Sequence, residues 1–426
     1  MGENPSFREA LRFWLKLGWI SFGGPAGQIA IMHRELVERK RWIGEERFLH
    51  ALNFCMLLPG PEATQLATYC GWLLHGVRGG LAAGILFVLP GALTLWGLSW
   101  IYVSYGTVPA VAGILYGLKA VVLAIVVAAV LRVGRKALKT PVAWGIAAAA
   151  LIALAVGRVP FPAVVLGALA AGFIGGKVWP EAFGLKVMAP LDASGAQTAL
   201  GTTRSTLRLA VAGLALWAAP VVAAGVFHGW SGLYAQLGFF FSKVAVVTFG
   251  GAYAVLPYVG QQAVENHGWV TAPQMLHGLA LAETTPGPLI LVLQYVGFLA
   301  GWANPGGLTS LGAATLGAAM TTWVTFVPTF LFILVGAPYV ERLRDNVRLS
   351  AALAAVTAAV VGVILNLALW FGWHAVWPNG WAAGMDGLVA TIGVVAFAAL
   401  HWGRIGLGWI VLGAALAGWG LRGLSG

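Results

Sequence analysis

The sequence repeats itself, because the stretch from Phe13 to Gln65 returns later in the chain without insertion or deletion. Lys16 and Lys243 are 227 residues apart, and so are Pro59 and Pro286. The other landmarks that keep this interval are Phe22-Gly23-Gly24 with Phe249-Gly250-Gly251, Trp42 with Trp269, and Pro59-Gly60-Pro61 with Pro286-Gly287-Pro288. An internal duplication constrains the whole fold, which we expect to consist of two related halves.

The composition indicates a membrane protein. Of 426 residues, 59% are hydrophobic and only 9% are charged, and the mean hydropathy is +0.85. Apolar runs of the roughly 20 residues that cross a bilayer recur along most of the length. The 59 Gly and 20 Trp suit closely packed transmembrane helices and the membrane interface. We therefore expect an all-α polytopic protein embedded in the lipid bilayer.

The net charge of +11 fits this class better than it fits a nucleic-acid-binding protein. Positive residues gather in the cytoplasmic loops of membrane proteins, so the surplus needs no nucleic acid partner. The polar stretch 1–12 precedes an apolar run that contains Lys16, so no cleavable signal peptide is predicted. Cys55 and Cys70 lie in apolar segments without metal-ligand spacing, which indicates free thiols and no metal site.

Each copy of the repeat predicts two broken helices. The apolar segment 13–32 is interrupted by Gly23-Gly24-Pro25 and has basic residues at both ends, which favours a re-entrant hairpin over a broken full span. Segment 48–76 repeats this pattern around Pro59-Gly60-Pro61. Four full spans are expected to follow in each half, at 79–106, 109–131, 141–157 and 161–176, and at 308–336, 349–372, 385–402 and 405–421.

The two halves are predicted to have opposite orientations. A linker and one inverting helix divide the chain into an N-terminal repeat, a connection and a C-terminal repeat, at residues 1–180, 181–227 and 228–426. Loop 34–47 holds several Arg and Lys residues, whereas its counterpart 259–274 holds none. Conversely, the uncharged loop 107–110 corresponds to a loop that contains Arg342, Arg344 and Arg348. This exchange is typical of an inverted-topology repeat, and it places most basic residues on the cytoplasmic side of the inner (plasma) membrane.

The breaks are where we expect a substrate to bind. Backbone at membrane depth must find hydrogen bonds inside the protein or in a wet cavity. Proline favours the first position of a helix, so Pro25 and Pro61 would start half-helices whose free N–H groups and positive dipole ends point into the bilayer. Four such ends that meet between the halves would form an anion cage. The alternative is that each break is a kink that serves packing.

Two lysines strengthen the prediction of an anion site. Lys16 and Lys243 each lie six residues before a Phe-Gly-Gly, and a lysine at the bilayer centre costs about 2.5–3.5 kcal/mol on insertion scales. Snorkelling towards the interface is the alternative, and for Lys119, which has no counterpart, both explanations stay open. The predicted substrate-binding residues are Lys16, Ser21, Gly23, Gly24, Pro25, Gln28, Pro59, Gly60 and Pro61, with Lys243, Thr248, Gly250, Gly251, Thr284, Thr285, Pro286, Gly287 and Pro288.

Glu62 and Glu283 are the candidates for proton coupling. Glu62 follows its Pro-Gly-Pro in a first helical turn, where the dipole favours the anion. Glu283 precedes its own Pro-Gly-Pro at the end of a half-helix, where dipole and burial favour the neutral acid; a structural hydrogen bond is the alternative. His50 and His277 lie at helix entrances and indicate structural roles. The sequence contains no nucleotide loop, metal-binding His motif or nucleophile elbow, so we expect neither an enzyme nor a cofactor.

At these motifs the sequence resembles the chromate ion transporter family in its long two-domain form. The resemblance covers nearly the whole chain and rests on Phe22-Gly23-Gly24-Pro25, on Trp42, on Leu-Pro-Gly-Pro-Glu-Ala at 58–63 and on Ala-Glu-Thr-Thr-Pro-Gly-Pro at 282–288. It implies a secondary transporter that exports chromate and confers chromate resistance, with the isosteric sulfate as a further candidate substrate. One departure is that Ala252 stands where the first copy has Pro25, so one half-helix lacks its proline start.

Two other functions stay open. A carrier of sulfate or another oxyanion would use the same site. An intramembrane enzyme acting on lipid phosphates would also exploit helix ends and lysines, but it needs a base beside a nucleophile or metal, and the sequence supplies no convincing set. Export itself needs no ATP, because a dianion that leaves an inside-negative cell gains roughly 4.6 kcal/mol per 100 mV. The architecture is also compatible with a homodimer.

Overall fold

The structure, a computed structural model, describes residues 5–22, 24–56, 58–183, 203–337, 347–378, 380–403 and 405–423. Within these ranges the chain folds into helices and contains no strand. Six helices are long and apolar enough to cross a membrane: α4 (Glu62–Tyr105), α5 (Pro109–Ala137), α7 (Phe161–Val178), α8 (Thr203–His228), α13 (Ser310–Gly336) and α15 (Val347–Val376). The predicted all-helical, multi-pass membrane protein is therefore confirmed.

Three of the nine expected full spans are short helices in the structure. These are α6 (Pro141–Ala155), α16 (Gly387–His401) and α17 (Leu407–Gly418), with 15, 15 and 12 residues. At about 1.5 Å per residue, 15 residues extend only about 22 Å, less than the roughly 30 Å of a hydrocarbon core. Helix α17 continues directly into the π-helical turn η7 (Trp419–Gly423) and so reaches the predicted end at 421, whereas α6 and α16 are slightly shorter than the predicted spans 141–157 and 385–402.

The duplication is visible in the boundaries of the helices. In the first half the elements are α1 (Phe7–Ile20), α2 (Gly24–His33), the π-helical turn η1 (Arg34–Arg39) and α3 (Glu45–Cys55). In the second half they are α9 (Leu233–Val247), α10 (Ala252–Gln261), the π-helical turn η3 (Gln262–Asn266) and α11 (Ala272–Thr284). A break separates α1 from α2 and α9 from α10. The second break of the first half separates α3 from α4. The equivalent break of the second half separates α11 from η4 (Leu289–Leu291), which α12 (Val292–Ala303) follows directly.

Helix α4 contains a sharp reversal that separates a half-helix from a full span. His75 and Gly76 leave helical geometry, and Gly76 has φ 61°, a conformation that favours glycine. The two limbs touch beyond the reversal, because a Cβ atom on Gly71 would lie 2.4 Å from the carbonyl oxygen of Gly79. The chain therefore reverses its direction at residues 75–76, and the span that follows occupies the range predicted from 79.

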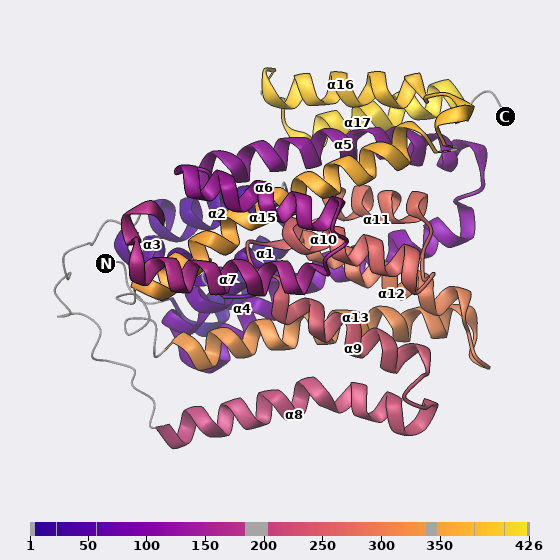
Figure 1. Ribbon diagram of the computed structural model, residues 1–426. Helices are drawn as coiled ribbons and strands as arrows, with labels where there is room; N and C mark the ends of the chain where they lie inside the picture. Colours follow the sequence, from indigo (N-terminus) through magenta and orange to yellow (C-terminus); the bar gives the residue numbers. More distant parts are fainter. Residues whose placement is uncertain are drawn as a thin grey trace.

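The two halves enter the structure from opposite ends (Figure 1). The N-terminus lies at the left of the view with α2 and α3, whereas α8 carries the chain to the right, where α9 begins and where α11 and α12 lie. The orientation of each half relative to the membrane stays a prediction. The predicted residues Gly23, Arg342 and Arg344, and the linker 184–202, lie outside the described residues.

Candidate functional site

The breaks of the two halves are joined by a reciprocal pair of hydrogen bonds, which we call the junction. The N–H of Gly60 donates to the carbonyl oxygen of Thr248 at 2.7 Å, and the N–H of Gly287 donates to that of Ser21 at 2.9 Å. Gly60 and Gly287 are equivalent in the repeat, and so are Ser21 and Thr248. Exchanging the halves therefore converts one bond into the other, as expected when two related units pack about a twofold axis.

Glycine and proline set the geometry of the junction. Gly60 has φ 130° and Gly287 has φ 93°, values that only glycine adopts readily. This freedom lets each N–H turn away from its own chain towards the other half. Pro25 lies in the first turn of α2, and Pro61 directly precedes α4, so both prolines start half-helices as the sequence predicted.

Ser21 and Thr248 contribute their carbonyl groups to the junction, and their hydroxyls donate to carbonyls of the preceding helix. The hydroxyl of Ser21 donates to the carbonyl of Leu17, and that of Thr248 donates to the carbonyl of Val244, both at 2.6 Å. Each hydroxyl satisfies one of the carbonyls left open at the end of a helix. The hydroxyls of Thr284 and Thr285 do the same at the end of α11. The sequence had suggested all four side chains as anion ligands.

Gln28 bridges the breaks of the two halves from within α2. Its side chain is buried, and its Nε2 donates to the carbonyl oxygen of Gly287 at 2.6 Å and to that of Ser21 at 3.3 Å. The equivalent residue of the second half is Val255, which cannot form such bonds. Gln28 was predicted to bind substrate, which stays a prediction; the structure places it between the breaks of both halves, and the junction is chemically asymmetric.

Several polar atoms at the junction are buried without a hydrogen bond among the described residues. They are Gln28 Oε1, Thr64 Oγ1 and Gln65 Oε1. The amide Nε2 of Gln65 is engaged, because it donates to the carbonyl of Pro59 at 2.8 Å. Buried polar atoms are rarely left unpaired unless a water molecule or a ligand completes them. These three atoms therefore have hydrogen-bonding capacity that the described residues do not use.

A row of buried threonines on α13 reaches the first-half break at one end. Thr321, Thr325 and Thr329 are spaced by four residues and lie on one face of the helix. A Cβ atom on Gly60 would lie 3.2 Å from Thr329 Oγ1, whereas Thr321 packs against Gly297 of α12. Sequence reasoning missed the threonines, although their regular spacing in an apolar helix was a visible signal.

Two carboxyl groups lie near the N-terminal ends of the half-helices. A Cβ atom on Gly251, directly before α10, would lie 3.4 Å from Glu62 Oε1. A Cβ atom on Gly24, the first residue of α2, would lie 3.8 Å from the Tyr253 hydroxyl, which donates to the buried carboxyl of Glu283. The positions expected to attract an oxyanion thus already face protein oxygens. Tyr253 was missed because its counterpart, Ala26, is not polar.

The predicted lysines are not part of the junction. Lys16 and Lys243 are both exposed, whereas Ser21 and Thr248, five residues further along, are fully buried. The Lys243 ammonium lies 5.9 Å from the ring centre of Tyr258 on α10. Lys119, by contrast, is 8% exposed and lies in the middle of α5. The structure therefore places the two equivalent lysines on exposed helix faces and the third one inside the protein.

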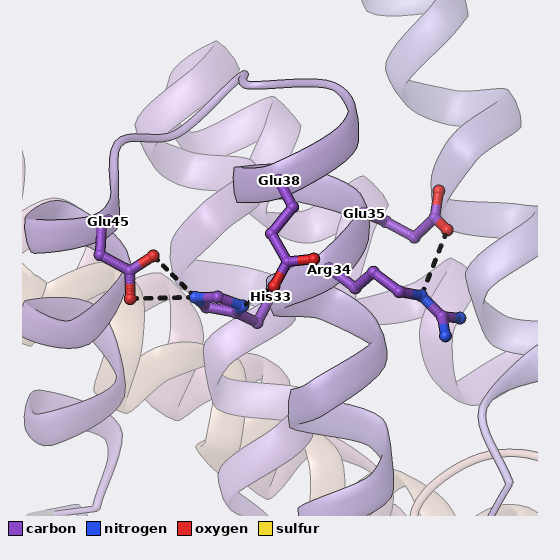
Figure 2. A network of polar contacts seen from close by, with 5 residues as sticks. All are labelled: His33, Arg34, Glu35, Glu38 and Glu45. Atoms are coloured by element: carbon purple, nitrogen blue, oxygen red, sulfur yellow. Dashed lines mark hydrogen bonds and ion pairs between the residues drawn. The ribbon is translucent and has the colours of Figure 1, made fainter.

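A network of charged and polar side chains connects the end of α2 to the turn η1 and to the start of α3 (Figure 2). His33, the last residue of α2, contacts Glu38 at 3.1 Å through Nδ1 and Glu45 at 2.8 Å through Nε2. The two ring nitrogens thus each contact a carboxyl group, one on η1 and one at the start of α3.

These features define a class of protein. Broken helices that meet inside a polytopic membrane protein, with buried polar side chains where they meet, are typical of membrane transporters. The described residues contain no group of three or more His, Cys, Asp or Glu side chains placed to hold a metal ion.

The chain belongs to the chromate transporter family, which it matches over residues 8–174 and 235–419. A chromate transport protein of Pseudomonas aeruginosa is 35% identical, over 97% of this chain and 92% of the relative. A chromate transport protein of Cupriavidus metallidurans is 29% identical, over 79% of this chain and 75% of the relative. A probable chromate transport protein of Synechococcus elongatus is 28% identical, over 81% and 79%. No solved structure matches the chain.

Proposed function

We propose that this protein exports chromate from the cytoplasm across the inner membrane and so confers chromate resistance. The observation that carries the proposal is the junction, where four broken helices of a chromate transporter family member meet around buried, incompletely bonded polar groups. Relatives named chromate transport proteins support the choice of substrate. An inside-negative potential supports export, since it drives a dianion outwards by roughly 4.6 kcal/mol per 100 mV.

The anion would bind to the N-terminal ends of α2 and α10 and to the free groups of the junction. Because Glu62 and the Tyr253–Glu283 pair already face these helix ends, a dianion would meet two carboxyl groups there. Negative charges at such short range repel strongly in a buried site. We therefore infer that substrate binding requires these carboxyls to be neutral or displaced, which would couple chromate movement to protons.

Chromate flux in inside-out membrane vesicles tests this function. Labelled chromate should accumulate in vesicles that contain the protein, faster when an imposed potential is positive inside the vesicle, which corresponds to outside the cell. Uptake equal to that of vesicles without the protein would reject chromate export.

Sulfate has the same tetrahedral shape and charge, so it is the appropriate competitor. Inhibition of chromate uptake by sulfate, together with uptake of labelled sulfate, would identify a general oxyanion carrier. Equal ionic strength in chloride is the control for screening of surface charge.

A further inference from the structure

A cavity of about 320 Å³ lies between α5 and α11, away from the junction. Its lining includes Pro109, Gly113, Tyr116, Lys119, Pro273 and His277. The four residues from α5 are spaced by three or four positions, so they form one face of that helix. Lys119 lies about 15 Å along the axis from Pro109, at about 1.5 Å per residue. The cavity thus extends from the start of α5 along the helix as far as Lys119.

The deep end of the cavity carries a buried cation. Lys119 is 8% exposed, and its ammonium lies 5.2 Å from the ring centre of Tyr116. The Tyr116 hydroxyl donates to the carboxylate of Asp386, which also accepts the N–H of Val389 at 3.2 Å. The Tyr116 hydroxyl and the Val389 N–H thus both donate to this carboxylate, at the start of α16. The Lys119 ammonium has three N–H donors, so it can bind a hydrated oxyanion in addition to its present neighbours.

The opposite wall of the cavity leads towards the junction. His277 lies on α11, and its Nδ1 contacts the hydroxyl of Tyr102 at 3.2 Å. Glu283 lies further along the same helix, about 9 Å from His277 at about 1.5 Å per residue. The other end of the cavity lies near the starts of α5 and α11, which the predicted topology places on the outer face of the membrane.

We propose that this cavity is a second binding site for the transported oxyanion, a tetrahedral dianion of the chromate and sulfate type, between the junction and the outer face. This rests on the proposed function. The volume corresponds to on the order of ten water molecules at about 30 Å³ each, so a partly hydrated anion fits. Lys119 attracts the anion after it leaves the junction, and the outer opening releases it.

Cysteine accessibility tests the site without relying on transport. Ala112 lines the cavity and is exposed, so Ala112→Cys in a background without the native cysteines gives a reporter. In intact cells we expect an anionic thiosulfonate reagent to react about tenfold faster than a cationic one, since a focused positive field accelerates anions. Sulfate should slow this reaction, and chloride at equal ionic strength should not. Chromate is unsuitable as the protecting anion because it oxidises thiols.

The matched variants separate charge from folding. Lys119→Gln should abolish both the tenfold preference and the protection by sulfate, while Lys119→Arg should keep them. Lys177→Gln, which removes an exposed cation on α7, should change neither. Equal reaction with neutral N-ethylmaleimide in all variants shows that the cavity is intact.

The outcomes keep the two proposals apart. Equal rates for both charged reagents and no protection by sulfate, in a protein that still transports chromate, would overturn the second site alone. A preserved preference and protection in a protein that fails the vesicle assay would instead overturn chromate export and leave an anion site.

Discussion

Gly91 of α4 is the most sensitive position that we find at the junction. A Cβ atom there would lie 2.2 Å from the carbonyl oxygen of Pro286 and 2.8 Å from Leu291 Cδ1. Ordinary contacts begin near 3.4 Å, so Gly91→Ala must move α4 and the second-half break apart by about 1 Å. The residue after Pro286 is Gly287, whose N–H donates to the carbonyl oxygen of Ser21 at 2.9 Å. A shift of about 1 Å would lengthen this hydrogen bond beyond the normal range of donor–acceptor distances.

The expected loss of stability follows from these two effects. Overpacking costs about 1–3 kcal/mol, and the lost hydrogen bond about 0.5–1.5 kcal/mol. Replacing glycine by alanine in a helix returns up to about 1 kcal/mol. The net destabilisation should therefore be about 0.5–4.5 kcal/mol, and chromate flux should fall by roughly a hundredfold, the size of effect that a 1 Å misplacement can have.

Gly97→Ala on the same helix is the matched control. A Cβ atom at Gly97 has no neighbour within 4 Å, so this change gains the helical preference without the clash. The difference between the two variants in denaturant unfolding and in vesicle flux isolates the contact with Pro286. Equal stability and equal flux in Gly91→Ala and Gly97→Ala would refute the argument that the break is rigidly packed against α4.

The remaining predictions address proton coupling, orientation and the lysines. Glu283→Gln should flatten the pH dependence of chromate flux, and Tyr253→Phe, which keeps the acid, should not; an unchanged profile in Glu283→Gln would leave that residue only a structural role. Single cysteines at Arg39 and Gln262 should react with impermeant reagents from opposite faces of the membrane, whereas labelling of both from the cytoplasm would contradict inverted halves. Lys243→Gln should alter apparent chromate affinity by no more than about fivefold, because exposed charges contribute about 0–1 kcal/mol; a loss above tenfold would place this lysine at the anion.

The sequence predicted those parts of the fold that depend on local chemistry. Glycine and proline interrupt a helix wherever they are placed in it, so the breaks at Gly24 and Gly60 and their repeats could be located. The interval between copies identified equivalent positions such as Ser21 and Thr248. Asymmetric contacts were beyond reach, because the Tyr253–Glu283 pair and the Gln28 bridge each exist in one half only.

The lysines show why the faces of membrane helices are hard to predict. In water an apolar stripe marks the buried side of a helix, but in lipid the outer side is apolar as well. On α1 the exposed neighbours of Lys16 include the hydrophobic residues Leu15, Trp19 and Ile20 as well as Arg12. Arg12 did mark this face of α1 as the outward one, but equal spacing from the breaks suggested a site shared by Lys16 and Lys243, which the structure places on exposed helix faces.

The crossed hydrogen bonds of the junction also bear on how the protein is made. Gly60 is synthesised long before its acceptor, Thr248; at about 5–20 residues per second, the delay is roughly 10–40 s. During that time the N–H of Gly60 lacks its partner in a membrane that offers no water, a state that costs several kcal/mol. The N-terminal repeat must therefore wait in an unfinished form until the C-terminal repeat emerges, and the breaks of both halves close together as a late step of biosynthesis.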